Sequence, residues 1–530
     1  MNITGKLFID GDWQQGSGGT YQAVNPASGQ RLDPPLSQAG AGQVKQAVAA
    51  AAAAAPVFRK LSLQKRADFL NACADEIMAL GDALLERVMA ETGYPRPRVE
   101  TERARTCNQL KLFASTALKG DWLNARIDTA MPERKPLPRP DIRYLNQALG
   151  PVVVFGSSNF PLAFSVAGGD TASAFAAGCP VLVKGHSSHP GTCELVAHAI
   201  ATAVKKCGLP GGVFSLLMGS GREVGAALVS APEVKAVGFT GSFAGGMALA
   251  KAASERPEPI PVFAEMGSVN PVFLLPGAAK ARAAQIAEGF VASLTLGTGQ
   301  FCTNPGMVIA LDDEATAVFI AETARRLAEV GAGVLLNEHI CSAYAEGIER
   351  FSAHKGVARV AQGKAAGDSG YYAQAALYAT TADYLVANSE IQEEVFGPVS
   401  LLVKCKSVDE MLRVAGMIKG QLTATLQAES AELAAHSELV DRLGLRAGRL
   451  LVNGFPTGVE VCDAMVHGGP FPATTDSRFT SVGTTAIARF VRPVCYQNFP
   501  EALLPDALRN HNPLNLMRMV NGEQTRAGIS

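Results

Sequence analysis

The 530-residue sequence has no long uninterrupted run of hydrophobic residues. Its most apolar stretch, Ala163 to Val183, is broken by Asp170, Pro180 and three glycines. A membrane-spanning helix needs about 20 apolar residues in succession, so we expect this stretch to form buried core. The N-terminal segment, Met1 to Trp13, also lacks the basic and apolar regions of a signal peptide. We therefore expect a cytoplasmic protein that does not associate with membranes.

Neither sign of charge dominates, because 47 Lys and Arg residues face 48 Asp and Glu residues. A nucleic-acid partner would call for a basic stripe, so none is expected. The 10 cysteines contain no CxxC pair, and the 8 histidines do not cluster with them at metal-ligand spacing. We predict reduced, mostly buried cysteines and no metal site. The chain is long enough for two or three domains.

Strands alternate with helices from residue 150 onward, after a helix-rich first hundred residues. The early helices are expected at Gln43 to Ala55, Leu63 to Ala79 and Asp82 to Glu91. Such alternation predicts mostly parallel sheets with helices on both faces, and ligands bind at the carboxyl ends of the strands. The expected strands are Pro151–Phe155, Pro180–Val183, Val213–Leu217, Val234–Phe239, Pro271–Leu275 and Met307–Leu311.

Two glycine-rich loops follow predicted strands, at Gly219 to Gly225 and Gly241 to Gly246. Glycine after a strand allows a phosphate to approach the backbone, and helix N-termini favour anions. Neither loop has the GxGxxG spacing of a dinucleotide-binding turn. On spacing alone, each is more simply interpreted as an ordinary turn between a strand and a helix.

Three residues outside these two loops could carry chemistry. Cys302 lies in a glycine-rich loop between a helix and a strand, where its thiolate could act as a nucleophile or the thiol could simply be buried. Glu265 lies among apolar residues before a glycine, where a raised pKa would suit a general base. Asn159 directly follows a strand; it could donate to an oxyanion or serve a turn.

Six ordered motifs resemble those of the aldehyde dehydrogenase superfamily, and the resemblance covers nearly the whole chain. They are Ser-Asn-Phe-Pro (158–161), the strand that ends in Lys184, Phe-Thr-Gly-Ser (239–242), Glu-Met-Gly (265–267), Gly-Gln-Phe-Cys (299–302) and Glu-Glu-Val-Phe-Gly-Pro (393–398). Departures from the usual pattern are Ser268 and Val269 after Glu-Met-Gly, and Ser157 and Ser158 before Asn159.

The resemblance implies a role for each residue. Cys302 would attack the aldehyde, Asn159 and the Cys302 N–H would hold the oxyanion, and Glu265 would activate water to hydrolyse the thioester. The residues implied at a nicotinamide cofactor are Lys184 and Glu394 at the riboses, Phe396 near the nicotinamide, Ser242 near the pyrophosphate, and Gly241, Gly246 and Gly267.

The resemblance also bears on the choice of cofactor. NAD-preferring members often have a glutamate three residues after the ribose lysine, but Ser187 stands there in this chain. Arg222 matches a position that NADP-preferring relatives use for the 2′-phosphate, and its planar guanidinium suits that group. We therefore predict NADP, with NAD as the weaker alternative. Arg222 could also be an ordinary surface arginine.

Narrower motifs around residues 452–459, 466–475, 480–483 and 492–497 resemble the α-ketoglutaric semialdehyde dehydrogenase branch, which forms 2-oxoglutarate. A keto-acid substrate needs cationic or amide groups at its far end. The candidate substrate residues are Phe160, Phe164, Arg105, Gln109, Phe455 and Thr457, although Arg105 could equally form a structural salt bridge. Other readings are a dehydrogenase of medium or long aliphatic aldehydes, a silent homologue, and an enzyme that transfers the acyl group to coenzyme A.

The expected architecture is α/β. A Rossmann-like cofactor domain would comprise residues 1–130 and 147–262, and an α/β catalytic domain residues 263–479. A small β oligomerisation arm and tail would comprise residues 131–146 and 480–530, with a hairpin at Met131–Asn146 and a strand at Ala486–Gln497. Because exposed edge strands seek partners, we expect a homodimer or a pair of dimers.

Overall fold

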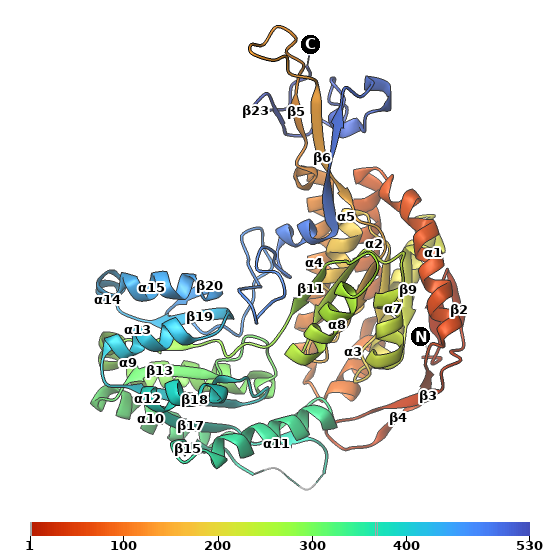
Figure 1. Cartoon of the computed structure of the whole chain (residues 1–530). Helices are drawn as coiled ribbons and strands as arrows, with labels where there is room; N and C mark the ends of the chain where they lie inside the picture. The colour runs from red at the N-terminus through yellow and green to blue at the C-terminus, as the bar shows by residue number, and fades with distance from the viewer. Residues whose placement is uncertain (1–2, 366, 368, 530) are drawn as a thin grey trace.

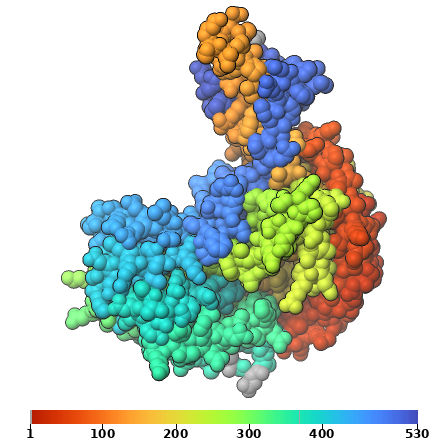
Figure 2. Space-filling view, in the orientation of Figure 1, coloured from red at the N-terminus to blue at the C-terminus, as the bar shows by residue number. Residues whose placement is uncertain are grey.

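The computed structural model describes residues 3–365, 367 and 369–529. Two α/β parts lie side by side, and a narrow β arm projects from them (Figure 1, Figure 2). Within the described ranges, no helix is both long and apolar enough to cross a membrane.

The first part is built on a seven-stranded sheet. Five strands run parallel, and the two N-terminal strands join the edge antiparallel. The order is β11 (Val262–Glu265), β10 (Ala236–Thr240), β7 (Val152–Phe155), β8 (Val181–Lys184), β9 (Phe214–Leu217), β1 (Leu7–Ile9) and β2 (Asp12–Gln14). The predicted parallel sheet is confirmed, but β1 and β2 were not predicted.

Helices cover this sheet and extend its core. The phenylalanines Phe58, Phe69 and Phe175 meet edge to face between α1, α2 and α5. The helices are α1 (Ala41–Arg59), α2 (Leu63–Ala79), α3 (Gly81–Thr92), α4 (Arg96–Lys119), α5 (Gly169–Ala177), α6 (Pro190–Lys206), α7 (Ala226–Ser230) and α8 (Phe243–Ser254).

The second part contains another seven-stranded sheet, in which all neighbours except β15 and β17 are parallel. Its order is β15 (Ala358–Gln362), β17 (Ala376–Thr381), β18 (Val399–Cys405), β13 (Met307–Leu311), β12 (Val272–Leu274), β19 (Gln421–Gln427) and β20 (Ala447–Val452). Buried apolar clusters lie on both faces. The helices are α9 (Pro276–Thr295), α10 (Glu314–Leu327), α11 (Glu338–Ala353), α12 (Ala382–Ala387), α13 (Val408–Met417), α14 (Ser430–Ala435) and α15 (Ser437–Gly444).

The two parts are joined through β11. Residues 263–265 pair with β10, so they continue the first sheet, whereas we predicted that the second domain begins at residue 263. The segment after β20 returns to this strand, where the Met266 N–H donates to the Ala473 carbonyl over 2.8 Å. An isolated bridge also joins Glu265 to Thr474. Distant parts of the chain therefore meet where β11 ends.

The arm is a five-stranded sheet, and the predicted hairpin forms its centre. Its order is β21 (Val491–Gln497), β6 (Ile142–Ala148), β5 (Arg126–Asp128), β22 (Arg518–Val520) and β23 (Glu523–Thr525). The predicted strand at Ala486–Gln497 is confirmed only from Val491 onward, because Thr484–Phe490 forms the 3₁₀ helix η6. There Arg489 donates to buried Asp170 over 2.7 Å, which holds this turn against α5.

The remaining strands form two small antiparallel pairs. They are β3 (Thr20–Val24) with β4 (Arg31–Ser37), and β14 (Gly333–Val334) with β16 (Tyr372–Ala373).

Candidate active site

Three candidate residues lie at the carboxyl ends of strands of the first sheet. Asn159 lies just after β7, Lys184 ends β8, and Glu265 ends β11. Parallel strands place their carboxyl ends at one edge of a sheet, and loops there form ligand sites. The structure therefore brings together residues that are far apart in the sequence.

Cys302 lies in the loop between the 3₁₀ helix η4 (Leu296–Gly299) and β13, directly after a conformationally unusual turn within η4. Gly297, Thr298 and Gly299 all have positive φ angles, of 54°, 60° and 65°. For Thr298 this is rare, because its β-branched side chain crowds the backbone there. The Asn270 side-chain amide holds the loop by donating to the carbonyls of Cys302 and Asn304, each over 2.9 Å.

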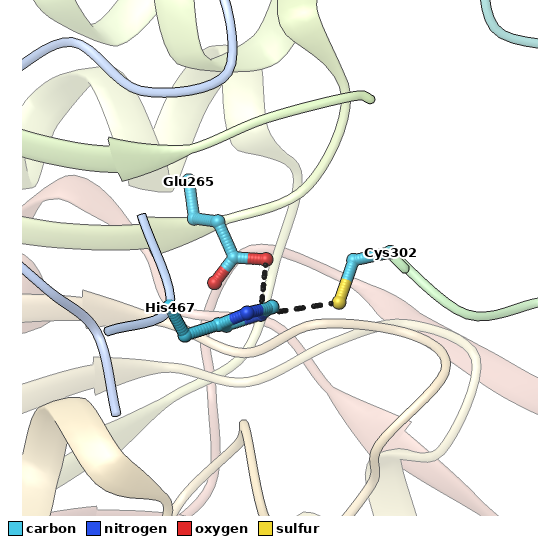
Figure 3. A group of neighbouring side chains, drawn as sticks. All are labelled: Glu265, Cys302 and His467. Carbon is cyan, nitrogen blue, oxygen red and sulfur yellow. Dashed lines mark hydrogen bonds and ion pairs between the residues drawn. The ribbon is translucent and has the colours of Figure 1, made fainter. Parts of the chain in front are cut away.

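The thiol, an imidazole and a carboxylate meet at the centre of the site (Figure 3). The Sγ of Cys302 lies 3.3 Å from Nε2 of His467. The same Nε2 lies 3.0 Å from Oε1 of Glu265. Ser481 donates from its hydroxyl to the other carboxylate oxygen over 2.7 Å. This arrangement can move a proton from the thiol to the imidazole beside a negative charge.

The pKa of each acidic group reflects these contacts. Burial, followed by the negative charge and hydrogen bond of Glu265, raises the pKa of the Cys302 thiol well above its usual range. Burial also raises the pKa of Glu265, but the charge and hydrogen bond of His467, with hydrogen bonds from Ser481 and Cys302, leave it below its ordinary value. The raised pKa that we predicted for Glu265 was therefore wrong, because its partners outweigh burial.

His467 is the functional candidate that sequence reasoning missed. It is 1% exposed and lies in the long segment between β20 and η6. Its backbone N–H donates to the Thr480 hydroxyl over 2.8 Å, and the Ser481 N–H donates to its carbonyl over 2.9 Å. The sequence feature that could have indicated this residue is a histidine before two glycines, in the motif at 466–475 that we used only to compare the chain with one branch of the family.

Asn159 is oriented toward the Cys302 loop. Its side-chain Nδ2 donates to the carbonyl of Gln300 over 3.0 Å, and its own carbonyl accepts from the Tyr94 hydroxyl and from Arg98. An amide nitrogen has two N–H groups, so one remains for a substrate oxygen. The position is compatible with the predicted oxyanion role.

The predicted ribose residues have few partners of their own. Among the described residues, the Lys184 ammonium makes no hydrogen bond or ion pair, and burial lowers its pKa. Burial raises the pKa of Glu394 to about 7; the Ser268 N–H opposes this rise and the charge of Glu265 adds to it. Gly267 leaves room for this carboxylate, because a Cβ there would overlap it. A lysine ammonium can donate hydrogen bonds to ribose hydroxyls, and a carboxylate can accept hydrogen bonds from them.

The predicted phosphate residues lie at the carboxyl ends of β8, β9 and β10. Ser187 is exposed after β8, and Arg222 is exposed in the π-helix η3 (Gly221–Gly225) after β9. Ser242 caps α8 by accepting the Gly245 N–H over 3.2 Å, and Gly241 precedes it. Exposed helix N-termini favour phosphate. Gly246 packs α8 against Met266, where a side chain would overlap. Phe396 lines a pocket with Glu394, Ser268 and Phe301.

A cluster of aromatic rings lies next to the His467 ring, which contacts the Cys302 thiol. Phe160 contacts Phe164 and Phe301 with ring centroids 5.3 Å apart, and Phe164 lies 6.1 Å from the His467 ring. The Gln109 amide nitrogen is buried without a partner among the described residues. Thr457 contacts the Ser293 hydroxyl over 3.0 Å, and Phe455 packs against Phe290 of α9.

Two guanidinium groups hold one loop near these rings. Arg105 on α4 donates to the Val459 carbonyl, and Arg449 on β20 donates to the carbonyls of Gly458 and Pro456 over 2.8 and 2.6 Å. Neither makes an ion pair with another described residue, so the salt bridge considered for Arg105 is not present there. Burial lowers the pKa of each; the charge of Glu102, then that of Cys302, opposes this at Arg105, and the charge of Cys302 opposes it at Arg449. Arg449 was not predicted.

The sequence is similar to known proteins over nearly its whole length. A sequence model described as the aldehyde dehydrogenase family matches residues 13–470. An alpha-ketoglutaric semialdehyde dehydrogenase 2 of Azospirillum brasilense is 53% identical, covering 99% of this chain and 100% of the relative. An alpha-ketoglutaric semialdehyde dehydrogenase of Acinetobacter baylyi is 46% identical, covering 98% and 99%.

Solved structures support the fold. A betaine aldehyde dehydrogenase from Staphylococcus aureus, crystallised with NAD+, superposes with a TM-score of 0.81 at 19% identity, covering 94% of this chain and 97% of that one. A lactaldehyde dehydrogenase from Escherichia coli gives a TM-score of 0.80 at 21% identity, covering 93% and 98%. At such identities the likeness concerns the fold alone.

Proposed function

Because this chain belongs to the aldehyde dehydrogenase family, we propose that it oxidises α-ketoglutaric semialdehyde to 2-oxoglutarate, with NADP as the preferred cofactor. The observation that carries the chemistry is the contact of the Cys302 thiol with His467, which in turn contacts Glu265. Full-length relatives at 53% and 46% identity that bear this substrate in their names support the choice of aldehyde.

Acylation begins with a proton transfer. His467 takes the thiol proton of Cys302, and the Glu265 carboxylate beside Nε2 stabilises the resulting imidazolium. The thiolate then bonds to the aldehyde carbon, and the carbonyl electron pair moves to oxygen. The free N–H of Asn159 and the Cys302 N–H, which donates to no other described residue, hold that oxyanion.

Deacylation requires water. A nicotinamide held by Lys184, Glu394 and Phe396 would supply the hydride acceptor, and loss of hydride from the tetrahedral carbon would leave a thioester on Cys302. Glu265 takes a proton from water, the hydroxide attacks the thioester carbon, and the carbon–sulfur bond breaks to release the acid. The lowered pKa keeps Glu265 ionised for this step at neutral pH. The net change is one aldehyde and one water to one acid, with two electrons passed to the cofactor.

The proposed substrate carries a carboxylate at the end away from the aldehyde, and the choice of substrate can be tested through the groups that would bind this carboxylate. Arg105 and Arg449 would supply the positive charge for a keto acid, since both lack an anionic partner among the described residues. We expect kcat/KM for α-ketoglutaric semialdehyde to exceed that for hexanal by about 10- to 100-fold, the value of charged hydrogen bonds. NADPH absorbance measures both reactions.

Variants at these arginines make the test specific. In Arg105→Met and Arg449→Met the preference for the keto acid should shrink, while hexanal oxidation stays near the wild-type rate. If hexanal is the better substrate of the wild type, the aromatic lining by Phe160, Phe164 and Phe301 would instead favour the aliphatic alternative, and the proposed substrate would be wrong.

Arg222 should determine the preference for NADP. We expect Arg222→Ala to lower kcat/KM for NADP by about 10- to 100-fold and to leave NAD nearly unchanged, because only NADP has the 2′-phosphate that a guanidinium can pair with. Arg359→Ala, an exposed arginine on β15, is the matched control. Equal losses with both cofactors would refute this role.

Cofactor affinity should depend on pH through Glu394. Its carboxyl has a pKa of about 7, and the ionised form is the stronger acceptor for a ribose hydroxyl. The KM for NADP should therefore fall as pH rises from about 6 to 8. Glu394→Gln should raise this KM and remove its pH dependence. A variant whose KM still falls over that range would contradict the assignment.

We also propose a cytoplasmic homodimer or pair of dimers. Strands β20 and β21 each lie at the edge of their sheet, and Leu450 and Val452 of β20 are 38% and 50% exposed. A strand of a second copy would cover such an edge. Light scattering of the full chain would give its mass in solution, and a monomer at micromolar concentration would contradict the proposal.

A further inference from the structure

The three central side chains also form a compact group of potential metal ligands. The Sγ of Cys302, Nε2 of His467 and a carboxylate oxygen of Glu265 lie within 4.8 Å of one another (Figure 3). They come from the loop before β13, the segment after β20, and the end of β11. The sequence has no local ligand spacing, so this group could be found only once the chain was folded.

The separations are close to those of a tetrahedral zinc site. Bond lengths of about 2.0–2.3 Å at tetrahedral angles place sulfur, nitrogen and oxygen ligands about 3.3–3.6 Å apart. Here Sγ and Nε2 are 3.3 Å apart, and Nε2 and Oε1 are 3.0 Å apart. The ligand atoms of Cys302 and Glu265 also lie within 4.8 Å of each other, so side-chain adjustments at these two residues would admit the ion.

The donor types select among metals. Thiolate and imidazole suit zinc and similar borderline ions, whereas magnesium and calcium need more oxygen ligands than one carboxylate supplies. Three protein ligands leave a fourth position for water, as in open zinc sites.

The surroundings would hold these ligands in place. Glu265 and His467 are 3% and 1% exposed, so bulk water competes little for the ion. Ser481 donates to the second oxygen of Glu265 over 2.7 Å, and the Asn270 amide donates to the Cys302 carbonyl over 2.9 Å. Hydrogen bonds of this outer kind orient metal ligands and strengthen binding.

We propose that Zn²⁺ binds reversibly to Cys302, His467 and Glu265 and thereby inhibits the protein. Binding replaces the thiol proton of Cys302 with the metal and releases that proton to solvent, without any change of oxidation state. The ion would occupy the nucleophile and both bases, so aldehyde could not react. The inhibition rests on the proposed function, whereas the binding rests only on the donor geometry.

Cobalt is the probe for binding, because Co²⁺ takes zinc sites and absorbs light. Titrating the full-length protein with Co²⁺ should give one equivalent per chain, a thiolate-to-cobalt charge-transfer band and the visible bands of tetrahedral cobalt. Zn²⁺ should erase these bands. Cys302→Ser, which is nearly isosteric, should lose the charge-transfer band. His467→Gln and Glu265→Gln should each weaken binding by at least about tenfold.

Cys495→Ser is the matched control, because this thiol is exposed on β21 of the arm. It should bind cobalt like the wild type. The proposal is overturned if the charge-transfer band survives in Cys302→Ser, if it is lost in Cys495→Ser, or if His467→Gln binds cobalt unchanged.

Activity then separates the two claims. With α-ketoglutaric semialdehyde and NADP, Zn²⁺ should inhibit in step with cobalt displacement, and a chelator should restore the full rate. If the protein binds cobalt at these residues but oxidises no aldehyde, the proposed function is refuted and the proposed metal site still stands. An active enzyme without the charge-transfer band would refute the site alone.

Discussion

Replacing Cys302 with alanine is expected to lower kcat/KM for aldehyde oxidation by at least about 10,000-fold, because no other group can form the thioester. The half-buried Cys302 thiol is the only sulfur within hydrogen-bond distance of His467 among the described residues. NADPH formation with α-ketoglutaric semialdehyde and with hexanal measures the loss.

The cofactor site should survive this change. NADP should bind Cys302→Ala with nearly the wild-type affinity, because Lys184, Arg222 and Glu394 are untouched. Cys341→Ala, a half-buried thiol on α11, serves as the control and should keep its activity. Full activity of Cys302→Ala on any aldehyde would refute the mechanism.

Replacing His467 with glutamine is expected to lower kcat/KM by about 100-fold or more at neutral pH, the usual contribution of a general base. Burial and Glu265 raise the pKa of the Cys302 thiol well above its usual range, so without His467 little thiolate forms. Because the thiolate is the reactive form, the activity of the variant should rise about tenfold per pH unit below that pKa. The wild type should rise less steeply.

This pH profile distinguishes a base from a structural residue. A purely structural role would lower the rate by the same factor at every pH and would also lower the melting temperature. His339→Gln, an exposed histidine on α11, is the control and should leave the profile unchanged. A constant ratio of wild type to His467→Gln over the whole pH range would contradict the proposed base.

The sequence predicted those elements whose signals are local. The amphipathic helix at Leu63–Ala79 was placed correctly to the residue as α2, and the strand at Met307–Leu311 as β13. The short apolar strands β7 and β8 also lie where they were predicted, because glycine and proline bound them.

Elements with weak local signals were missed. Strands β1 and β2 have three residues each, too few to show an alternating pattern, and they are stabilised by pairing with β9 far along the chain. Residues 486–490 have a strand-like composition, yet the buried ion pair of Arg489 with Asp170 holds them in a 3₁₀ helix.

The site was predicted only in part, because some of its residues lie in local motifs and others are brought there only by folding. Cys302, Glu265 and Asn159 lie in motifs, and their neighbourhood follows from the rule that ligands meet strand ends. His467 lies 165 residues from Cys302 in a segment without periodicity, so only folding brings it to the thiol. That contact also reverses the predicted pKa direction of Glu265, because a partner charge cannot be read from apolar neighbours.

The most direct test of the account is mass spectrometry of Glu265→Gln, mixed with α-ketoglutaric semialdehyde and NADP and quenched within the first turnover. Without the carboxylate that activates water, the thioester should accumulate. The proposed mechanism predicts an acyl group at the oxidation level of the acid on the peptide that contains Cys302, formed only when NADP is present. An acyl group on another residue, or none while NADPH still forms, would contradict it.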